Sequence, residues 1–218
     1  MAALSVFGID FYSTFRYSTL RTIEERLVKM RQTKIPSLGY ALLGLLQKPS
    51  SGYDLRKVFS STSMKTYSDS PGAIYPALGR LERSGLIRGA IEEGSGLRRR
   101  QVFRLTPKGL SELKTWITRP VTRENMVRGQ EEILLRFAFC ETAVGPAAAV
   151  ELLKSLEAAL QAHVPALQEE LREIKTAMPT SARLAFECGI RGNRSLLDWT
   201  HYAIATYERE GKRKGGTA

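Results

Sequence analysis

Three consecutive arginines, Arg98, Arg99 and Arg100, follow a Gly94-Ser95-Gly96 turn. Three guanidinium groups on one loop suit the phosphates of a nucleic-acid backbone, or insertion into a narrow minor groove. The alternative is a run of solvated charge, which needs no ligand. The residues around the triplet must decide between these two interpretations.

Residues 70–91 place further cations on one side of a short predicted helix. Apolar residues at helical spacing predict its buried side: Ile74, Leu78 and Leu81. The other side carries Tyr75, Gly79, Arg80 and Arg83. We expect Ser70 to cap the helix, Gly85 to end it, and regular structure to begin near Gly72 and to tolerate Pro76. Such a helix fits the major groove of B-DNA, and an ordinary amphipathic helix with a solvated basic side is the alternative.

The net charge of +11 is concentrated in one region of the chain. Residues 30–119 hold sixteen Lys and Arg against six Asp and Glu, a net charge of +10. Residues 1–29 hold four Lys and Arg against three Asp and Glu, and residues 120–218 hold thirteen residues of each sign. Positive charge concentrated in one region favours a polyanionic binding partner, because the cations neutralise phosphates and release counterions when the partner binds. Nucleic acid is therefore the expected partner.

The sequence offers little for catalysis or metal binding. His163 and His201 lie in separate predicted helices, and no cysteine or acid pair lies near them at ligand spacing. The acid pairs at 131–132 and 169–170 fit solvated helix faces, and no phosphate-binding loop or nucleophile motif occurs. We expect no enzyme, no cofactor and no metal site.

The composition is that of a globular protein in a reducing compartment. Cys140 and Cys188 are isolated, no apolar run reaches membrane-spanning length, and the first residues lack a secretory signal. We expect a cytoplasmic, nucleoid-associated protein without a membrane partner. Residues 1–35 form an N-terminal extension with a predicted helix at 18–31, although Met30 is an alternative start.

The cationic segments belong to a predicted winged helix-turn-helix domain at residues 36–118. Its expected elements are helices at 36–46, 53–59 and 72–84, strands at 87–91 and 101–105, and a fourth helix ending at 117. Pro36 suits a first helical position, and Ser51 and Thr106 are the expected caps of the second and fourth helices. The two strands alternate so that Ile87 and Ile91 share a buried face, and the arginine-rich turn between them makes a wing.

The series PSLGYALLGLL, SGYDL, SPGAIYPALGRLERSGLI and FRLTPKGL closely resembles the PadR family of winged-helix transcriptional regulators. The resemblance covers residues 36–118 closely and 119–210 in outline. It implies a dimer with an N-terminal DNA-binding domain and a C-terminal helical domain that makes the dimer contact. With the cations above, the expected DNA contacts are Ser51, Tyr53, Lys57, Ala73, Tyr75, Arg80, Arg83, Arg98, Arg99 and Arg100. Gly79 stands where many members carry a larger side chain, so we expect few direct side-chain contacts with bases.

Residues 119–210 form the predicted helical dimerisation domain. After a polar connector at 118–129, a helix with apolar residues Ile133, Leu134, Phe137 and Cys140 ends near residue 145. A long helix with an apolar stripe from Ala149 to Ile174 follows, and Pro165 should kink it near residue 161. We expect the stripe to pack on a second copy, with a helical hairpin inside one chain as the alternative. The expected interface residues are Leu153, Leu156, Leu160, Leu167, Leu171 and Leu197.

A last helix at 181–209 is apolar on several sides, and Gly189 and Gly192 permit close helix approach or a local break. The candidate effector-binding residues in this helix are Phe186, Trp199 and Tyr202, although plain core packing is the alternative for such aromatics. Residues 211–218 are expected to form a disordered basic tail.

Together these observations predict a mainly α protein: an N-terminal winged helix-turn-helix with a two-stranded wing, followed by a C-terminal helical dimerisation domain. The predicted function is that of a homodimeric repressor that binds an inverted repeat in double-stranded DNA, relieved by a small aromatic or apolar effector. The alternatives are a winged-helix adaptor for an acidic protein partner and a non-specific DNA-binding protein.

Overall fold

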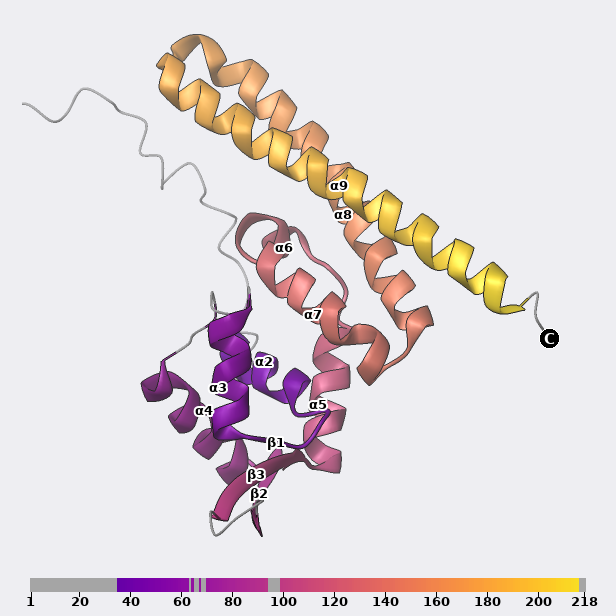
Figure 1. Cartoon of the computed structure of the whole chain (residues 1–218). Helices are drawn as coiled ribbons and strands as arrows, with labels where there is room; N and C mark the ends of the chain where they lie inside the picture. Colours follow the sequence, from indigo (N-terminus) through magenta and orange to yellow (C-terminus); the bar gives the residue numbers. More distant parts are fainter. Residues whose placement is uncertain (1–34, 63, 65–66, 68–69, 94–98, 216–218) are drawn as a thin grey trace, which may run out of the picture. The chain divides into compact units, whose positions relative to one another are not determined.

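The computed structural model describes residues 35–218, apart from 63, 65–66, 68–69, 94–98 and 216–218. Its elements are α2 (Ser37–Leu45), β1 (Ser50–Ser51), α3 (Gly52–Ser61), α4 (Pro71–Arg83), β2 (Ile87–Glu93), β3 (Arg99–Leu105), α5 (Pro107–Ile117), α6 (Arg123–Arg128), α7 (Gln130–Ala143), α8 (Pro146–Ile174), the 3-10 helix η2 (Lys175–Ala177) and α9 (Thr180–Gly215) (Figure 1). The helix predicted at 18–31 lies outside the described residues.

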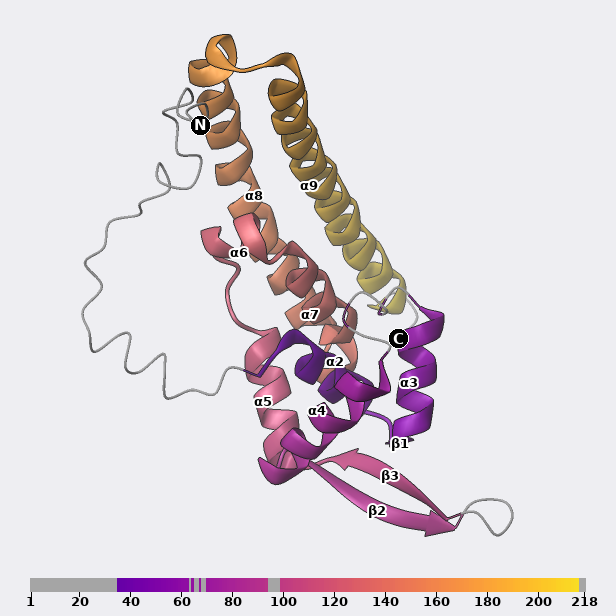
Figure 2. The ribbon, with the colours of Figure 1, turned by 90° about the vertical axis from the view of Figure 1, so that its left-hand side faces the viewer.

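The N-terminal half is a winged helix. Fully buried side chains of α2, α4 and α5 form its core: Leu42, Leu43, Ile74, Leu78 and Leu113. Beside them lies an antiparallel sheet of order β1-β3-β2, in which β2 and β3 pair from Ile87 with Leu105 to Glu93 with Arg99. The β2–β3 hairpin is the wing and extends beyond the helices (Figure 2). The predicted fold class and the buried side of the third helix are confirmed.

Capping chemistry fixes the ends of these helices. The side chains of Ser51, Ser70 and Thr106 accept from the backbone N–H groups of Asp54, Gly72 and Gly109, as predicted for helix N-caps. At the end of α4, Gly85 has a φ of +70°, and Leu86 N–H donates to the Leu81 carbonyl oxygen at 3.0 Å. Gly85 N–H also donates to Glu82 O at 2.9 Å, which completes a Schellman motif and turns the chain into β2.

Some boundaries in this half differ from the prediction. The sheet has a third strand, because Ser50 and Ser51 pair with Phe103 and Val102; a two-residue strand has no alternation that a sequence pattern can show. Ile91 was expected to be buried but is 71% exposed, since it lies toward the hairpin tip. Pro36 is the N-cap of α2 rather than its first residue, and α4 begins at Pro71, one residue early.

The C-terminal half is built on a hairpin of α8 and α9, against which α6 and α7 pack (Figure 1). Met126, Ile133, Leu156 and Leu160 form a buried cluster, with Trp199 packed against it. Leu153, Leu156 and Leu160 are therefore buried within a single chain, and the expectation that their stripe needs a second copy to cover it is wrong. For this part of the stripe the structure has the helical hairpin within one chain. Leu167, Leu171 and Leu197 are half-buried, which leaves part of each side chain accessible.

Further corrections concern short or ambiguous segments. The polar connector contains α6, closed by a capping box of Thr122 and Asn125. Leu134 is exposed, and Leu135 is buried in its place. The helix α9 continues to Gly215, through most of the predicted tail. A Cβ atom at Gly189 or Gly192 would meet open space, so neither glycine is needed for close helix packing within the chain.

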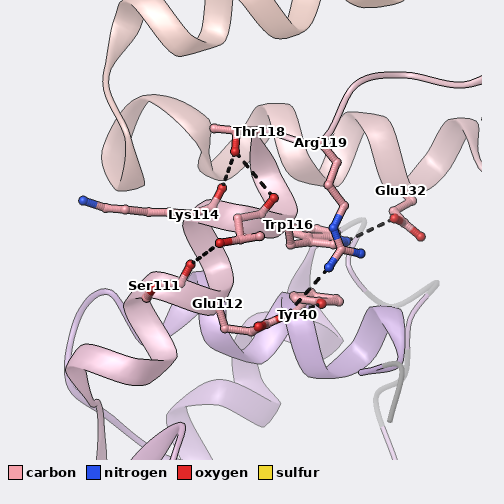
Figure 3. A network of polar contacts seen from close by, with 9 residues as sticks. Tyr40, Ser111, Glu112, Lys114, Trp116, Thr118, Arg119 and Glu132 are labelled. Carbon is pink, nitrogen blue, oxygen red and sulfur yellow. Dashed lines mark hydrogen bonds and ion pairs between the residues drawn. The ribbon is translucent and has the colours of Figure 1, made fainter. Parts of the chain in front are cut away.

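A polar junction joins the two halves where α2 and α5 meet α7 (Figure 3). The rings of Tyr40 and Trp116 stack with centroids 4.2 Å apart. The Tyr40 hydroxyl donates to Glu112 at 2.8 Å, and Trp116 Nε1 donates to Glu132 of α7 at 3.1 Å. Burial, reinforced by Glu112, raises the pKa of Tyr40 well above its ordinary value, so this hydroxyl stays a donor. Tyr40 and Trp116 both belong to the winged helix, and the bond from Trp116 to Glu132 crosses to the helical half.

Close packing reinforces the junction. A Cβ atom on Gly44 of α2 would lie 2.3 Å from the ring of Phe139 in α7, so only glycine permits this approach. On the α5 side, Glu112 also lies 3.9 Å from the guanidinium of Arg119, which begins the connection to α6. The winged helix is therefore attached to the helical half by fixed contacts.

Candidate nucleic-acid interface

The first turn of α3 is the centre of the candidate interface. Ser51 Oγ accepts from the Asp54 backbone N–H at 3.2 Å and donates to the Asp54 carboxylate at 2.7 Å. That carboxylate lies 3.7 Å from Arg100 Nη1 on the wing strand β3. Both partners of the pair are about half exposed, so it adds little stability. The pair shows that a wing arginine lies beside the N-terminus of α3.

Tyr75 of α4 stands against the same turn. An ideal Cβ atom on Gly52 would lie 2.6 Å from Tyr75 Cε1, so the absence of a side chain at Gly52 makes room for the ring. Tyr75 nevertheless remains 49% exposed. Tyr53, one residue after Gly52, is 61% exposed, and the Arg56 guanidinium lies 5.5 Å from its ring centroid. Two aromatic side chains with accessible surface therefore flank the start of α3.

Four of the predicted residues are thus brought together around this turn: Ser51, Tyr53, Tyr75 and Arg100. Lys57 is exposed one turn after Tyr53 on α3, and Ala73 is half-buried one turn before Ala77 on α4. Arg80 and Arg83 are exposed in the last turn of α4. At a rise of about 1.5 Å per residue, Arg83 lies about 12 Å along the helix from Tyr75. Arg98 lies outside the described residues, as does the side chain of Arg99.

Several contacts that orient α4 are not evident in the sequence. Glu82 accepts from the Gly89 backbone N–H of β2 at 2.8 Å, and Lys108 of α5 donates to the Ser84 carbonyl oxygen at 2.9 Å. These bonds fix the last turn of α4 to the sheet and to α5. By contrast, the hydrogen bonding between Ser51 and Asp54 is predictable from the sequence, because Ser-x-x-Asp is the spacing of a helix N-cap residue and the third residue of the helix.

The candidate effector residues do not converge within the chain. Trp199 packs on the cluster between α6, α7 and α8, and its ring meets Phe137 edge-on at 5.5 Å. Tyr202 is exposed, and Phe186 lies thirteen residues before Trp199, about 20 Å along the helix. The three aromatics therefore line no common cavity, and core packing accounts for Trp199.

A polar groove of about 600 Å³ lies between the start of α2, the α6–α7 turn and α9. Its walls are already bridged by hydrogen bonds. The Tyr67 hydroxyl donates to the Glu131 carbonyl oxygen at 3.0 Å, and the Gln130 amide donates to Asn193 Oδ1 at 2.8 Å.

No three His, Cys, Asp or Glu side chains converge as metal ligands among the residues that the structure describes. Within that same part of the chain, every helix is too short or too polar to cross a membrane.

Sequence comparison shows which known proteins this chain is similar to. A family model described as the transcriptional regulator PadR-like family matches residues 42–115. The negative transcriptional regulator PadR of Bacillus subtilis (strain 168) is 30% identical over 178 residues, which cover 79% of this chain and 89% of that protein.

Among solved structures, B. subtilis PadR in complex with operator DNA is 22% identical to this chain, with a TM-score of 0.36. The match covers 79% of this chain and 99% of the PadR chain. The same protein in complex with p-coumaric acid is 21% identical, with coverages of 81% and 98% and a TM-score of 0.35. A PadR-like regulator from Bacillus cereus is 21% identical, with coverages of 79% and 99% and a TM-score of 0.35.

Proposed function

Because this chain belongs to the PadR-like family of transcriptional regulators, and is therefore not an enzyme, we propose that it is a repressor that binds operator DNA as a homodimer. The B. subtilis relative is named a negative regulator, which supports the sign of the regulation. The remaining support comes from the residues gathered at the start of α3.

The observation that carries the proposal is the arrangement of Ser51, Tyr75 and Arg100 around one helix N-terminus. A helix N-terminus offers backbone N–H groups and a partial positive charge to a phosphate. Tyr75 belongs to α4, whose exposed side would enter the major groove, while Arg100 belongs to the wing. A single DNA duplex would then meet a phosphate site, a groove-binding helix and a wing at adjacent positions.

A homodimer would set the spacing between two α4 helices and so select an inverted repeat. The surfaces left accessible on the hairpin support such pairing: Leu184 and Tyr202 of α9 are exposed, and Leu167 and Leu171 of α8 are half-buried. Some of the interface predicted at Leu167, Leu171 and Leu197 is therefore retained in the proposal.

We further propose that a small aromatic or apolar effector weakens DNA binding, as the p-coumaric acid complex of B. subtilis PadR suggests. Trp199 is an intrinsic fluorophore whose environment depends on α7, because its ring contacts Phe137 of that helix. Its fluorescence should change with an effector that also releases DNA. A panel of phenolic and hydrophobic acids that alters neither signal would contradict this part of the proposal.

The test of DNA binding is selection of bound fragments from genomic DNA, followed by affinity titration at several salt concentrations. We expect enrichment of a palindromic site and strong loss of affinity when Arg98, Arg99 and Arg100 become alanine. The charge-matched control replaces Lys154, Arg183 and Arg209, which lie on the α8–α9 hairpin, and should bind normally. Uniform binding to all fragments would favour a non-specific DNA-binding protein, and no binding at low salt would favour an adaptor.

A further inference from the structure

A second concentration of positive charge lies on the hairpin, away from the winged helix in sequence. A groove of about 410 Å³ is bounded by the end of α8, η2 and the first half of α9. Its lining contains four cations, Arg172, Lys175, Arg191 and Arg194, against one carboxylate. The surrounding region 120–218 carries equal numbers of both signs, so this excess is local.

The carboxylates nearby do not neutralise the groove. Glu187, the one acid in the lining, already accepts from Arg183 at 2.8 Å. Arg172 pairs with Glu169 along its own helix, where both side chains are largely exposed and the pair is weak. Within the described part of the chain, no carboxylate forms an ion pair with Lys175, Arg191 or Arg194. Three cations therefore line the groove without an ion pair to any carboxylate among the described residues, although Glu187 lies in the same lining.

The spacing of the cations suits one shared ligand. Arg191 and Arg194 are three residues apart on α9, and Arg172 and Lys175 are three apart across the end of α8, so each pair lies on one side of its element. Like charges at this spacing repel one another until an anion binds between them. Guanidinium groups bind phosphate and carboxylate oxygens through paired N–H donors, which favours a ligand with several such oxygens.

The floor of the groove is apolar. Ile190 is buried and Leu171 is half-buried beneath the cations, and Gln168 adds an amide at one side. A volume of this size falls within the range of small-molecule sites, and cations over an apolar floor suit a compact organic anion.

We propose that this groove binds a small multivalent anion, of the organic phosphate or polycarboxylate class, and that Arg172, Lys175, Arg191 and Arg194 are its ligands. The site lies on α8, η2 and α9 and shares no residue with the proposed DNA interface. Leu171 in the floor also belongs to the surface proposed for the dimer, but none of the four cations does, so anion binding is tested separately from DNA binding. Because the ligand would touch both helices of the hairpin, its binding should stabilise the folded protein.

The test uses calorimetric titration of the full chain with two probes, pyrophosphate and citrate, in a low-salt buffer without divalent cations. The test variant is R191Q/R194Q, and the matched control is K154Q/R209Q, which removes two cations from the same hairpin outside the groove. We expect the wild type and the control to bind, and the test variant to bind at least tenfold more weakly. Binding of pyrophosphate alone would assign a ligand of the phosphate class, and binding of citrate alone a polycarboxylate.

Circular dichroism and the unfolding midpoint without ligand show whether R191Q/R194Q folds; if it does not, Lys175→Gln in η2 replaces it, with Lys154→Gln as its control. The proposal is overturned if the wild type binds neither probe, or if test and control variants lose affinity equally. It is also overturned if R191Q/R194Q weakens binding to double-stranded DNA while neither probe binds, since the groove would then serve nucleic acid.

Discussion

Arg136 of α7 caps the last turn of α5: its Nε and Nη2 atoms donate to the carbonyl oxygen of Ile117 at 3.1 and 2.9 Å. Nη2 also donates to the carbonyl oxygen of Arg119. The side chain is 2% exposed, and burial lowers the pKa of its guanidinium while the nearby Glu132 opposes that shift. A buried charge thus binds orphan carbonyls at a helix C-terminus, where the helix dipole favours a cation.

We expect Arg136→Met to lower the free energy of unfolding by about 3 kcal/mol, because two buried carbonyl oxygens lose their donors and Glu132 loses its neighbouring charge. Urea denaturation measures the change. Arg209→Met, at an exposed position of α9, is the control and should alter stability by less than about 0.5 kcal/mol. A loss in Arg136→Met no larger than that of the control would show that water replaces the guanidinium without cost.

The contact between Gly52 and Tyr75 gives a prediction about DNA affinity. Gly52→Ala should displace the Tyr75 ring from its place against α3, since the new Cβ atom would lie 2.6 Å from Cε1. We expect the affinity for the selected operator to fall about tenfold, equivalent to about 1.4 kcal/mol. Fluorescence anisotropy with a labelled operator measures it.

The matched control for this glycine is Gly192→Ala on α9, where a Cβ atom meets open space. It should keep full DNA affinity and raise the free energy of unfolding by roughly 0.5–1 kcal/mol, because alanine is the better helix former. Equal affinity in both alanine variants would show that Tyr75 does not depend on Gly52 for its position at the DNA.

Arg100 gives a prediction about salt dependence. If its guanidinium neutralises one phosphate, Arg100→Gln should make the plot of log affinity against log salt concentration shallower by about 1. Arg209→Gln removes the same charge outside the interface and should leave the slope unchanged. An unaltered slope in Arg100→Gln would mean that its pairing with Asp54, at 3.7 Å, persists on DNA and keeps the arginine from the backbone.

Local signals in the sequence account for most of the winged helix. The caps Ser51, Ser70 and Thr106 and the stop at Gly85 depend on neighbouring residues only, and all four were predictable. The strand β1 and the helix α6 were missed because two and six residues are too short to show a period.

Packing partners were harder to predict than elements. The stripe through Leu153, Leu156 and Leu160 shows that one side of α8 is buried, but periodicity carries no information on whether the covering helix belongs to the same chain. In α7, the run Ile133-Leu134-Leu135 is apolar throughout, so the choice of Leu135 over Leu134 depends on where α5 and α8 lie. The Gly52–Tyr75 contact and the Arg136 cap join residues 23 and 19 positions apart, and no local pattern predicts either.

His163 of α8 gives the last prediction, which concerns pH. Its Nδ1 atom is buried without a hydrogen-bond partner among the described residues. Burial, reinforced by Arg123 of α6 and opposed by Glu170, lowers the pKa of His163 below its ordinary value of 6.5. The folded state therefore favours the neutral ring, and the unfolded state takes up a proton first as the pH falls. Stability from this residue is present above about pH 6.5 and is lost below it.

We expect the free energy of unfolding of the wild type to fall between about pH 7.5 and about pH 5, and His163→Gln to reduce that fall, because glutamine does not titrate. Urea denaturation at the two pH values measures the difference between the proteins, which cancels contributions from carboxylates common to both. His201→Gln is the control, because it removes the other histidine of the chain, whose ring lies 2.9 Å from Glu157. This variant should retain the acid-induced loss of unfolding free energy. If His163→Gln and the wild type lose equal stability, protonation of His163 is accommodated in the folded state by Glu170, and the buried Nδ1 carries no acid sensitivity.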